Sequence, residues 1–335
     1  MSETHADIPS VVDRTHPVKV GAGVVGVHFL GDTAAFVLSE EALLFASLKG
    51  DERRVPVHGG GILCSAANDD VIVTGGDDGN VVSANAKGEV AVIAANAKAT
   101  WADHAAISRN GAVAWSAGRR AYVRSGKGEM QDIEVPSTVG ALAFLPKGFR
   151  LAVAHYNGAT LWFPNAKAEP ERLEWKGSHL GATVSPDGRF LVTSMQEATL
   201  HGWRLVDRKD MRMQGYSSRV RSLDWTHDGK WLATSGSTQL ILWPFSAKDG
   251  PMGKTPQLFA PTEVSVEAVA CHPKQNVVAA GYADGLILLV RTDDGAEVLA
   301  RKPENAPVTA LAWSADGKLL AFGTEDGSAG ILNLA

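Results

Sequence analysis

Histidine, cysteine and the acidic residues are the side chains of this sequence that most readily bind metals. The ten histidines are dispersed one or two at a time along the chain, whereas a zinc site needs ligands clustered at short spacing. Cys271 and His272 are adjacent, but consecutive side chains on a strand point to opposite faces. Both cysteines, Cys64 and Cys271, lie in apolar runs and are expected to be buried thiols. We therefore expect no metal site.

Catalytic motifs are likewise missing from the sequence. It contains no G-x-S-x-G elbow, no P-loop and no H-E-x-x-H. The carboxylates in the strands expected to lie innermost are Asp103, Asp224 and Glu267, and they belong to different repeats, while acid–base hydrolysis of a glycosidic bond needs a pair at defined separation. We expect no catalytic residue, no cofactor and no enzyme activity. The alternative is a small-ligand-binding or hydrolytic site at the mouth of a central channel.

The elements that would position such groups are repeated along the chain. Turns of one type occur at "SPDG" (185–188), "THDG" (226–229) and "SADG" (314–317), and related turns precede them with a period of about 40 residues. The repeats contain short runs rich in Val, Ile, Leu, Trp and Thr, four in a complete repeat, such as "RLAVAHYN" (150–157), and turn residues bound these runs. These are strand signals, and no run keeps helical spacing long enough for a helix. The chain is predicted to be all-β.

A four-stranded sheet cannot bury both of its faces alone, so neighbouring repeats must stack, and about 40 residues per four strands is typical of a propeller blade. We predict a single closed β-propeller of four-stranded antiparallel blades over residues 9–335, with eight blades; the alternative is seven. The last repeat lacks a fourth strand, and segment 9–20 is expected to supply it and close the ring. Residues 1–8 are expected to be a flexible tail. The predicted repeats are 21–57, 58–98, 99–136, 137–176, 177–217, 218–263, 264–305 and 306–335.

These motifs resemble the WD40 repeat family. The resemblance depends on the turns above, on second turns such as Asp78-Gly79 and Asp326-Gly327, and on the third-strand tryptophans Trp162, Trp203 and Trp243, which the resemblance makes structural. The repeats are divergent, because Phe163, Arg204 and Pro244 follow these tryptophans where the family has Asp. The fifth repeat has Thr193, Glu197 and Trp203 but no His at the expected distance.

The resemblance implies a non-catalytic scaffold that binds one or more protein partners through loops on the top face. Arginine and aromatic side chains are common anchors of protein interfaces, although each candidate also has a structural explanation in the half-exposed strands or between blades. The top-face candidates are Arg119, Arg120, Arg219, Arg221, Tyr216, Trp101, His104 and His179.

Charge and hydropathy restrict the other function classes. The net charge of −5 disfavours a nucleic-acid partner, since such proteins usually carry a basic face. No run approaches the apolar length of a membrane helix, and the polar start "MSETHADIPSVVD" is unlike a signal peptide. We expect a cytoplasmic protein with no membrane partner.

Overall fold

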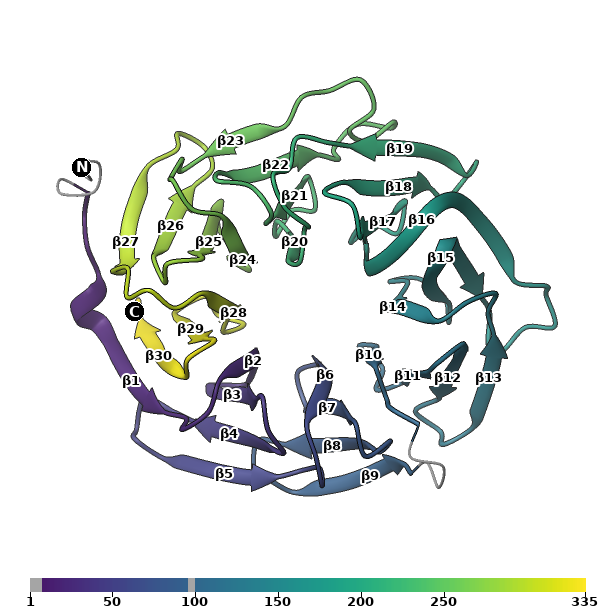
Figure 1. Ribbon diagram of the computed structural model, residues 1–335, viewed down its shortest axis with the longest axis horizontal. Coiled ribbons are helices and arrows are strands. Elements are labelled where there is room, and N and C mark those ends of the chain that lie inside the picture. The colour runs from purple at the N-terminus through teal and green to yellow at the C-terminus, as the bar shows by residue number, and fades with distance from the viewer. Residues whose placement is uncertain (1–7, 96–99) are drawn as a thin grey trace. The chain divides into compact units, whose positions relative to one another are not determined.

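The computed structural model describes residues 8–95 and 100–335, and over this range nearly all regular structure is β-strand (Figure 1). A short 3-10 helix, η1 (Val12–Arg14), precedes the first strand. Within these residues no helix has the length and apolarity needed to cross a bilayer. Residues 1–7 of the predicted flexible tail lie outside the described range. Ile8, the last residue of the predicted tail, is partly buried and packs against a buried cluster.

The described residues group into two compact units. Unit 1 takes in 8–38, 44–53 and 216–335, and four antiparallel sheets have most or all of their residues in it. In sheet order their strands are β2 (Val24–Leu30), β3 (Thr33–Leu38), β4 (Ala42–Ala46) and β5 (Glu52–Pro56); β20 (Leu223–Trp225), β21 (Trp231–Thr234), β22 (Leu240–Pro244) and β23 (Gln257–Phe259); β24 (Val266–Cys271), β25 (Val277–Tyr282), β26 (Ile287–Arg291) and β27 (Glu297–Arg301); and β1 (Thr15–Lys19), β30 (Ser328–Asn333), β29 (Leu319–Thr324) and β28 (Val308–Trp313).

The last of these sheets joins the two ends of the described chain. β1 pairs antiparallel with β30, from Thr15 opposite Leu332 to Lys19 opposite Ser328 (Figure 1). The segment before β1 also bonds to β27, since the amide of Val11 donates to the carbonyl of Leu299 (2.9 Å). The prediction that the N-terminal strand completes the last blade is confirmed. This pairing covers a strand edge that would otherwise be open to other chains.

Unit 2 takes in residues 39–43, 54–95 and 100–215. It holds two four-stranded sheets and one six-stranded sheet. Their strands in order are β6 (Ile62–Ala67), β7 (Val71–Gly76), β8 (Val81–Asn85) and β9 (Val90–Ala94); β10 (His104–Ile107), β11 (Val113–Ala117), β12 (Arg120–Arg124) and β13 (Met130–Glu134); and β14 (Val139–Phe144), β15 (Leu151–Trp162), β16 (Glu171–Val184), β17 (Phe190–Met195), β18 (Leu200–Arg204) and β19 (Lys209–Met213).

The number of blades differs from the prediction. Over the described residues there are seven sheets, and none is closed on itself by hydrogen bonds, so the structure has seven blades and the predicted eight is wrong. The reason lies in the fourth and fifth repeats. β16 runs from the end of one repeat into the start of the next, and Tyr156 of β15 pairs with Ser178 of β16. The hydrogen-bonded ladder therefore continues across the boundary that the sequence predicts between the fourth and fifth repeats, at residues 176 and 177.

The repeated turn motif has a local physical basis. In "SPDG" the hydroxyl of Ser185 donates to Asp187 (2.7 Å) and accepts from the amide of Phe190 (3.0 Å). Gly188 has φ 77°, which glycine adopts without steric cost. Ser314 and Asp316 repeat the first contact at 2.8 Å. The motif recurs because each first hairpin needs its turn held in this way.

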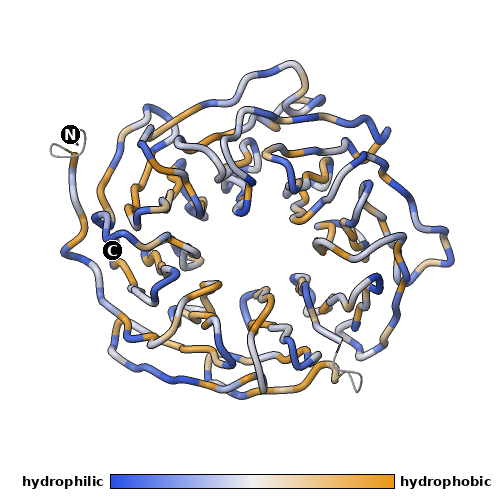
Figure 2. Tube along the Cα trace, in the orientation of Figure 1, coloured by the Kyte–Doolittle hydropathy of each residue, from blue (hydrophilic) through white to orange (hydrophobic). Residues whose placement is uncertain are grey.

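The hydrophobic core lies between neighbouring sheets within each unit. In unit 2, one cluster combines Val123 of β12 with Leu151 and Val153 of β15. In unit 1, another combines Leu242 of β22 with Val278 of β25. Middle strands such as β18 and β26 are buried along most of their length, and β26 is mostly apolar (Figure 2). They lie between two neighbours and bury both faces, which explains why their sequences do not alternate.

Candidate functional site

Buried histidines organise the blades of unit 2. The ring of His58 contacts Thr74 Oγ1 through Nε2 (2.8 Å) and Asp78 Oδ1 through Nδ1 (3.0 Å). Burial alone raises the pKa of Asp78, but the amides of Gly59 and Asn80 and the His58 ring outweigh it and lower the pKa to about 2. A carboxylate this well bonded stays ionised and fixes the turn around it.

The fifth repeat contains the histidine that its sequence spacing did not reveal. His179 Nδ1 lies 2.7 Å from Thr193 Oγ1, and its ring centroid lies 5.5 Å from that of Trp203. Nε2 bonds to the carbonyl of Trp175 (3.0 Å). Since a carbonyl only accepts, Nε2 carries the proton of the neutral ring, and the Thr193 hydroxyl is shared between Nδ1 and the carbonyl of His201 (3.1 Å). A bulge between His179 and Gly181 sets this geometry, and spacing alone could not predict it.

This arrangement corrects one predicted interaction residue. His179 is 1% exposed, and both of its ring nitrogens are bonded within unit 2. Burial lowers its pKa, which keeps the ring neutral. His179 is therefore part of the internal frame rather than of a partner-binding surface.

Tyr216 has a comparable role in unit 1. Its hydroxyl accepts from Trp243 Nε1 (2.8 Å) and lies 3.0 Å from Thr234 Oγ1. Burial raises the pKa of Tyr216. Tyr216 contacts a threonine and a buried tryptophan, as His179 does in the fifth repeat. Its hydroxyl therefore makes hydrogen bonds inside the blade. Tyr216 is half-buried, so a contact with a partner stays a prediction.

The three third-strand tryptophans are all buried, as a structural role requires. Trp162, Trp203 and Trp243 are 7%, 1% and 6% exposed. Trp101, by contrast, is 58% exposed in unit 2 and remains available to a partner. His104 is half-buried in the same unit, and burial lowers its pKa.

The four candidate arginines form two pairs with different surroundings. In unit 2, Arg119 is ion-paired with Glu134, and Arg120 with Asp132 and Glu134. The hydrogen bond that Arg120 donates to Asp132, and the negative charge of that carboxylate, raise the pKa of Arg120. These partners lie in the neighbouring outer strand β13, so both guanidinium charges are compensated on the blade surface.

Arg219 and Arg221 in unit 1 differ from that pair. Neither has a carboxylate within ion-pair distance among residues 8–95 and 100–335. Arg219 is half-buried, and its Nε is buried with no hydrogen-bond acceptor in the described part of the chain. Burial, and then the charge of Arg221, lower the pKa of Arg219. This pair therefore carries uncompensated positive charge.

Two of the three carboxylates considered for catalysis, Asp224 and Glu267, accept hydrogen bonds from groups within unit 1. Asp224 accepts from the amides of Trp225 (2.8 Å) and Cys271 (2.7 Å), and burial raises its pKa to about 6. Glu267 accepts from the hydroxyl of Ser265. Across the described residues, no group of three or more His, Cys, Asp or Glu side chains is placed to bind a metal ion.

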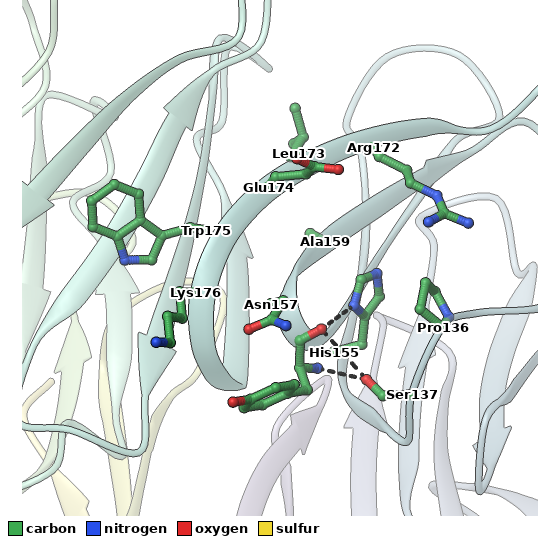
Figure 3. A pocket seen from close by; sticks show the side chains of 11 residues that line it. Pro136, Ser137, His155, Asn157, Ala159, Arg172, Leu173, Glu174, Trp175 and Lys176 are labelled. Atoms are coloured by element: carbon green, nitrogen blue, oxygen red, sulfur yellow. Dashed lines mark hydrogen bonds between the residues drawn. The ribbon is translucent and has the colours of Figure 1, made fainter.

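Two adjoining pockets in unit 2 were not predicted from the sequence. The larger, about 640 Å³, lies between β15 and β16 and is lined by Pro136, Arg172 and Glu174 among others (Figure 3). The second, about 410 Å³, reaches Glu197 and Arg212. Both are bounded by Tyr156, Trp175 and Lys176. We call this shared wall the ridge. In the sequence, the residues of the ridge lie in "YNG" (156–158) and "WKG" (175–177). Nothing in these two segments distinguishes them from ordinary turns.

Comparisons with known proteins agree with this architecture. Residues 209–244 match the family model described as WD domain, G-beta repeat. Residues 269–335 match the anaphase-promoting complex subunit 4 WD40 domain. Among solved structures, the crystal structure of the computationally designed Ika8 protein is similar, with a TM-score of 0.77, 17% identity, and coverage of 95% of this chain and 98% of that one. At that identity the likeness concerns the fold alone.

Proposed function

We propose that this chain, which belongs to the WD40-repeat β-propeller family, is a non-catalytic platform that binds an acidic protein partner through Arg219 and Arg221. WD40 domains generally mediate protein interactions, and the family is generally non-catalytic. The specific surface is our inference from the two arginines.

One observation supports this surface above the other candidates. The Nε of Arg219 is buried without an acceptor, and an unsatisfied buried donor costs about 1–3 kcal/mol. The neighbouring Arg221 adds repulsion between like charges. A carboxylate from a partner would compensate the charge of the two guanidinium groups and relieve the repulsion between them, and arginine can hold a carboxylate with two parallel hydrogen bonds. Arg119 and Arg120 already have such partners.

The test compares these two pairs directly. Tagged wild type, the double variant Arg219→Ala/Arg221→Ala and the matched control Arg119→Ala/Arg120→Ala are used to capture proteins from an extract of the native cells. We expect a stoichiometric protein partner with wild type and with the control, and its loss with the first variant. The control should fold normally, since exposed ion pairs contribute only about 0–1 kcal/mol.

A purified partner then allows its affinity to be measured. Binding should weaken as the salt concentration rises from about 0.1 M to about 1 M, where the Debye length falls from about 10 Å to about 3 Å. Equal binding by all three proteins would contradict the proposed surface. A purified protein that carries a stoichiometric metabolite and no protein partner would contradict the platform function itself.

A further inference from the structure

The ridge of unit 2 is built by an irregularity in two adjacent strands. Tyr156 pairs with Ser178, but the next pair is Gly158 with Glu174, so Trp175, Lys176 and Gly177 bulge out of the ladder. Bulges of this kind redirect side chains and are frequent beside functional sites. The result is a protruding wall with a pocket on each side.

Several contacts hold the bulge rigidly in place. The amide of Gly177 donates to Asn157 Oδ1 (3.2 Å), and the carbonyl of Trp175 accepts from His179 (3.0 Å). The indole of Trp175 stacks on the buried ring of His201. Asn157 itself has φ 68°, an uncommon conformation for a residue with a side chain. A wall fixed in this way loses little entropy when a partner binds.

Three of the five Arg, Lys and Glu side chains around the ridge are positive, and none of these three is ion-paired within the described residues. Arg172 and Lys176 are exposed, and neither has an ion-pair partner within the described residues, unlike Arg119, Arg120 and Arg208 in the same unit. Arg212 has no ion-pair partner in the described part of the chain either; with the side-chain amide of Gln214 turned so that its oxygen faces the guanidinium, Arg212 donates to this neutral group (2.7 and 3.0 Å).

This local excess stands out in a chain whose net charge is −5. The charged side chains that line the two pockets are Arg172, Lys176 and Arg212, opposed by Glu174 and Glu197. Cations without counter-ions favour an anionic partner, and complementary charge raises the rate of association as well as its specificity.

The ridge also offers exposed aromatic surface. Tyr156 is 51% exposed, and Trp175 is half-buried with its indole held against His201. Tyrosine and tryptophan contribute large contact areas at low entropic cost and often anchor interfaces. Aromatic groups next to unpaired cations fit a segment that presents carboxylates beside an apolar side chain.

We propose that the ridge binds an acidic segment of a protein partner in extended conformation. Its carboxylates pair with Arg172, Lys176 and Arg212, and an apolar side chain between them covers Tyr156 and Trp175. A single-stranded nucleic acid also combines negative charge with stacking. Glu174 and Glu197, however, lie among the cations and would repel its continuous row of phosphates, whereas a peptide can space its charges to avoid them. This site does not involve Arg219 or Arg221.

The experiment uses a defined probe and the whole chain. A displayed library of random peptides about 12 residues long, enough to span about 40 Å when extended, is selected against the wild-type protein. We expect enrichment of peptides that have at least two Asp or Glu residues flanking a Leu, Phe or Trp. Binding of a synthetic enriched peptide is then measured by fluorescence anisotropy.

Three variants test the site. Lys176→Glu and Tyr156→Ala should each weaken binding of the enriched peptide by about tenfold or more. The control Lys127→Glu changes the same charge at an exposed position elsewhere in unit 2 and should leave binding within about twofold. Circular dichroism on each variant shows that the fold is intact.

Several outcomes of these experiments would overturn the proposal. Failure to enrich any peptide, enrichment of peptides without acidic residues, or equal loss with Lys127→Glu would each contradict an acidic segment at the ridge. So would tighter binding of a single-stranded oligonucleotide than of any peptide, if Lys176→Glu abolishes it. The Arg219→Ala/Arg221→Ala protein should bind the enriched peptide normally, so failure of this site and failure of the proposed function are distinguishable.

Discussion

The imidazole of His201 stacks on the indole of Trp175, with ring centroids 4.0 Å apart and planes inclined by 15°. His201 is fully buried, and neither ring nitrogen has a hydrogen-bond partner in the described part of the chain. The carboxylate of Asp210 lies 4.0 Å from Nε2, beyond hydrogen-bond distance. His201 therefore acts as an aromatic spacer that supports the ridge.

His201 should make the protein less stable in mild acid. Burial, followed by the charges of His179 and Arg212, lowers its pKa from 6.5 to about 3. Between these values the unfolded chain binds a proton that the folded chain does not. The stability that the protein gains from the lowered pKa of His201 is complete above pH 6.5 and is lost as the pH falls toward about 3. The free energy of unfolding decreases by at most about 1.4 kcal/mol per pH unit in this range.

The substitution His201→Phe tests this linkage, because it keeps an aromatic ring against Trp175 and removes the titration. Urea unfolding at about pH 7 and about pH 5 should show a smaller loss of stability for the variant than for wild type. His227→Phe, at an exposed position, is the control. An unchanged pH dependence in His201→Phe would show that His201 is not responsible.

Asn157 is expected to stabilise the bulge in two separable ways. Its side chain accepts from Gly177, and its backbone has φ 68°. Asn157→Ala removes the acceptor and strains the backbone, so it should cost about 1–3 kcal/mol. Asn157→Gly removes only the acceptor and should cost less. Urea unfolding measures both, and a larger loss for the glycine variant would contradict this account.

Thr193 should be essential to the internal frame of the fifth repeat. Thr193→Val keeps the shape but leaves His179 Nδ1 without its partner, at an expected cost of about 1–3 kcal/mol in the free energy of unfolding. Thr255→Val, at an exposed loop position, should change stability by no more than about 0.5 kcal/mol. Similar values for the two variants, measured by urea unfolding, would argue against the bond.

Tyr216→Phe should destabilise unit 1 by the loss of one hydroxyl. That hydroxyl accepts from Trp243 and contacts Thr234, and leaving these groups unsatisfied should cost about 1–3 kcal/mol. The measurement is chemical unfolding monitored by circular dichroism. The partner-binding assay should be unaffected at temperatures where the variant is folded. Lost binding with unchanged stability would instead identify Tyr216 as a contact residue.

The sequence predicted the features that repeat and missed those that occur once. Turn residues such as Ser185 and Asp187 report a local hydrogen-bond pattern, so the all-β fold and the strands of most repeats could be inferred from them. The pairing of Tyr156 with Ser178 depends on a bulge in β16, and it changes the number of blades. Register shifts have no reliable mark in sequence, because the same residues fit either pairing.

The candidate site shows the same division. Arginine and aromatic residues were identified by type, but type does not reveal whether a charge is already paired. Arg120 has Glu134 opposite it on β13 and also pairs with Asp132, while Arg219 has no such neighbour in the described residues. The burial of His179 likewise follows from the bulge beside it.

The pairing of β1 with β30 also determines when the protein can finish folding. β1 leaves the ribosome early, and its partner is made roughly 300 residues later. At about 5–20 residues per second, this separation corresponds to a delay of about 15–60 s. During synthesis β1 must remain unpaired, while the sheets made by the residues between β1 and β30 are already able to form. Completion of this blade therefore has to wait until β30 is made, and chaperones that bind exposed strands have their longest opportunity at β1.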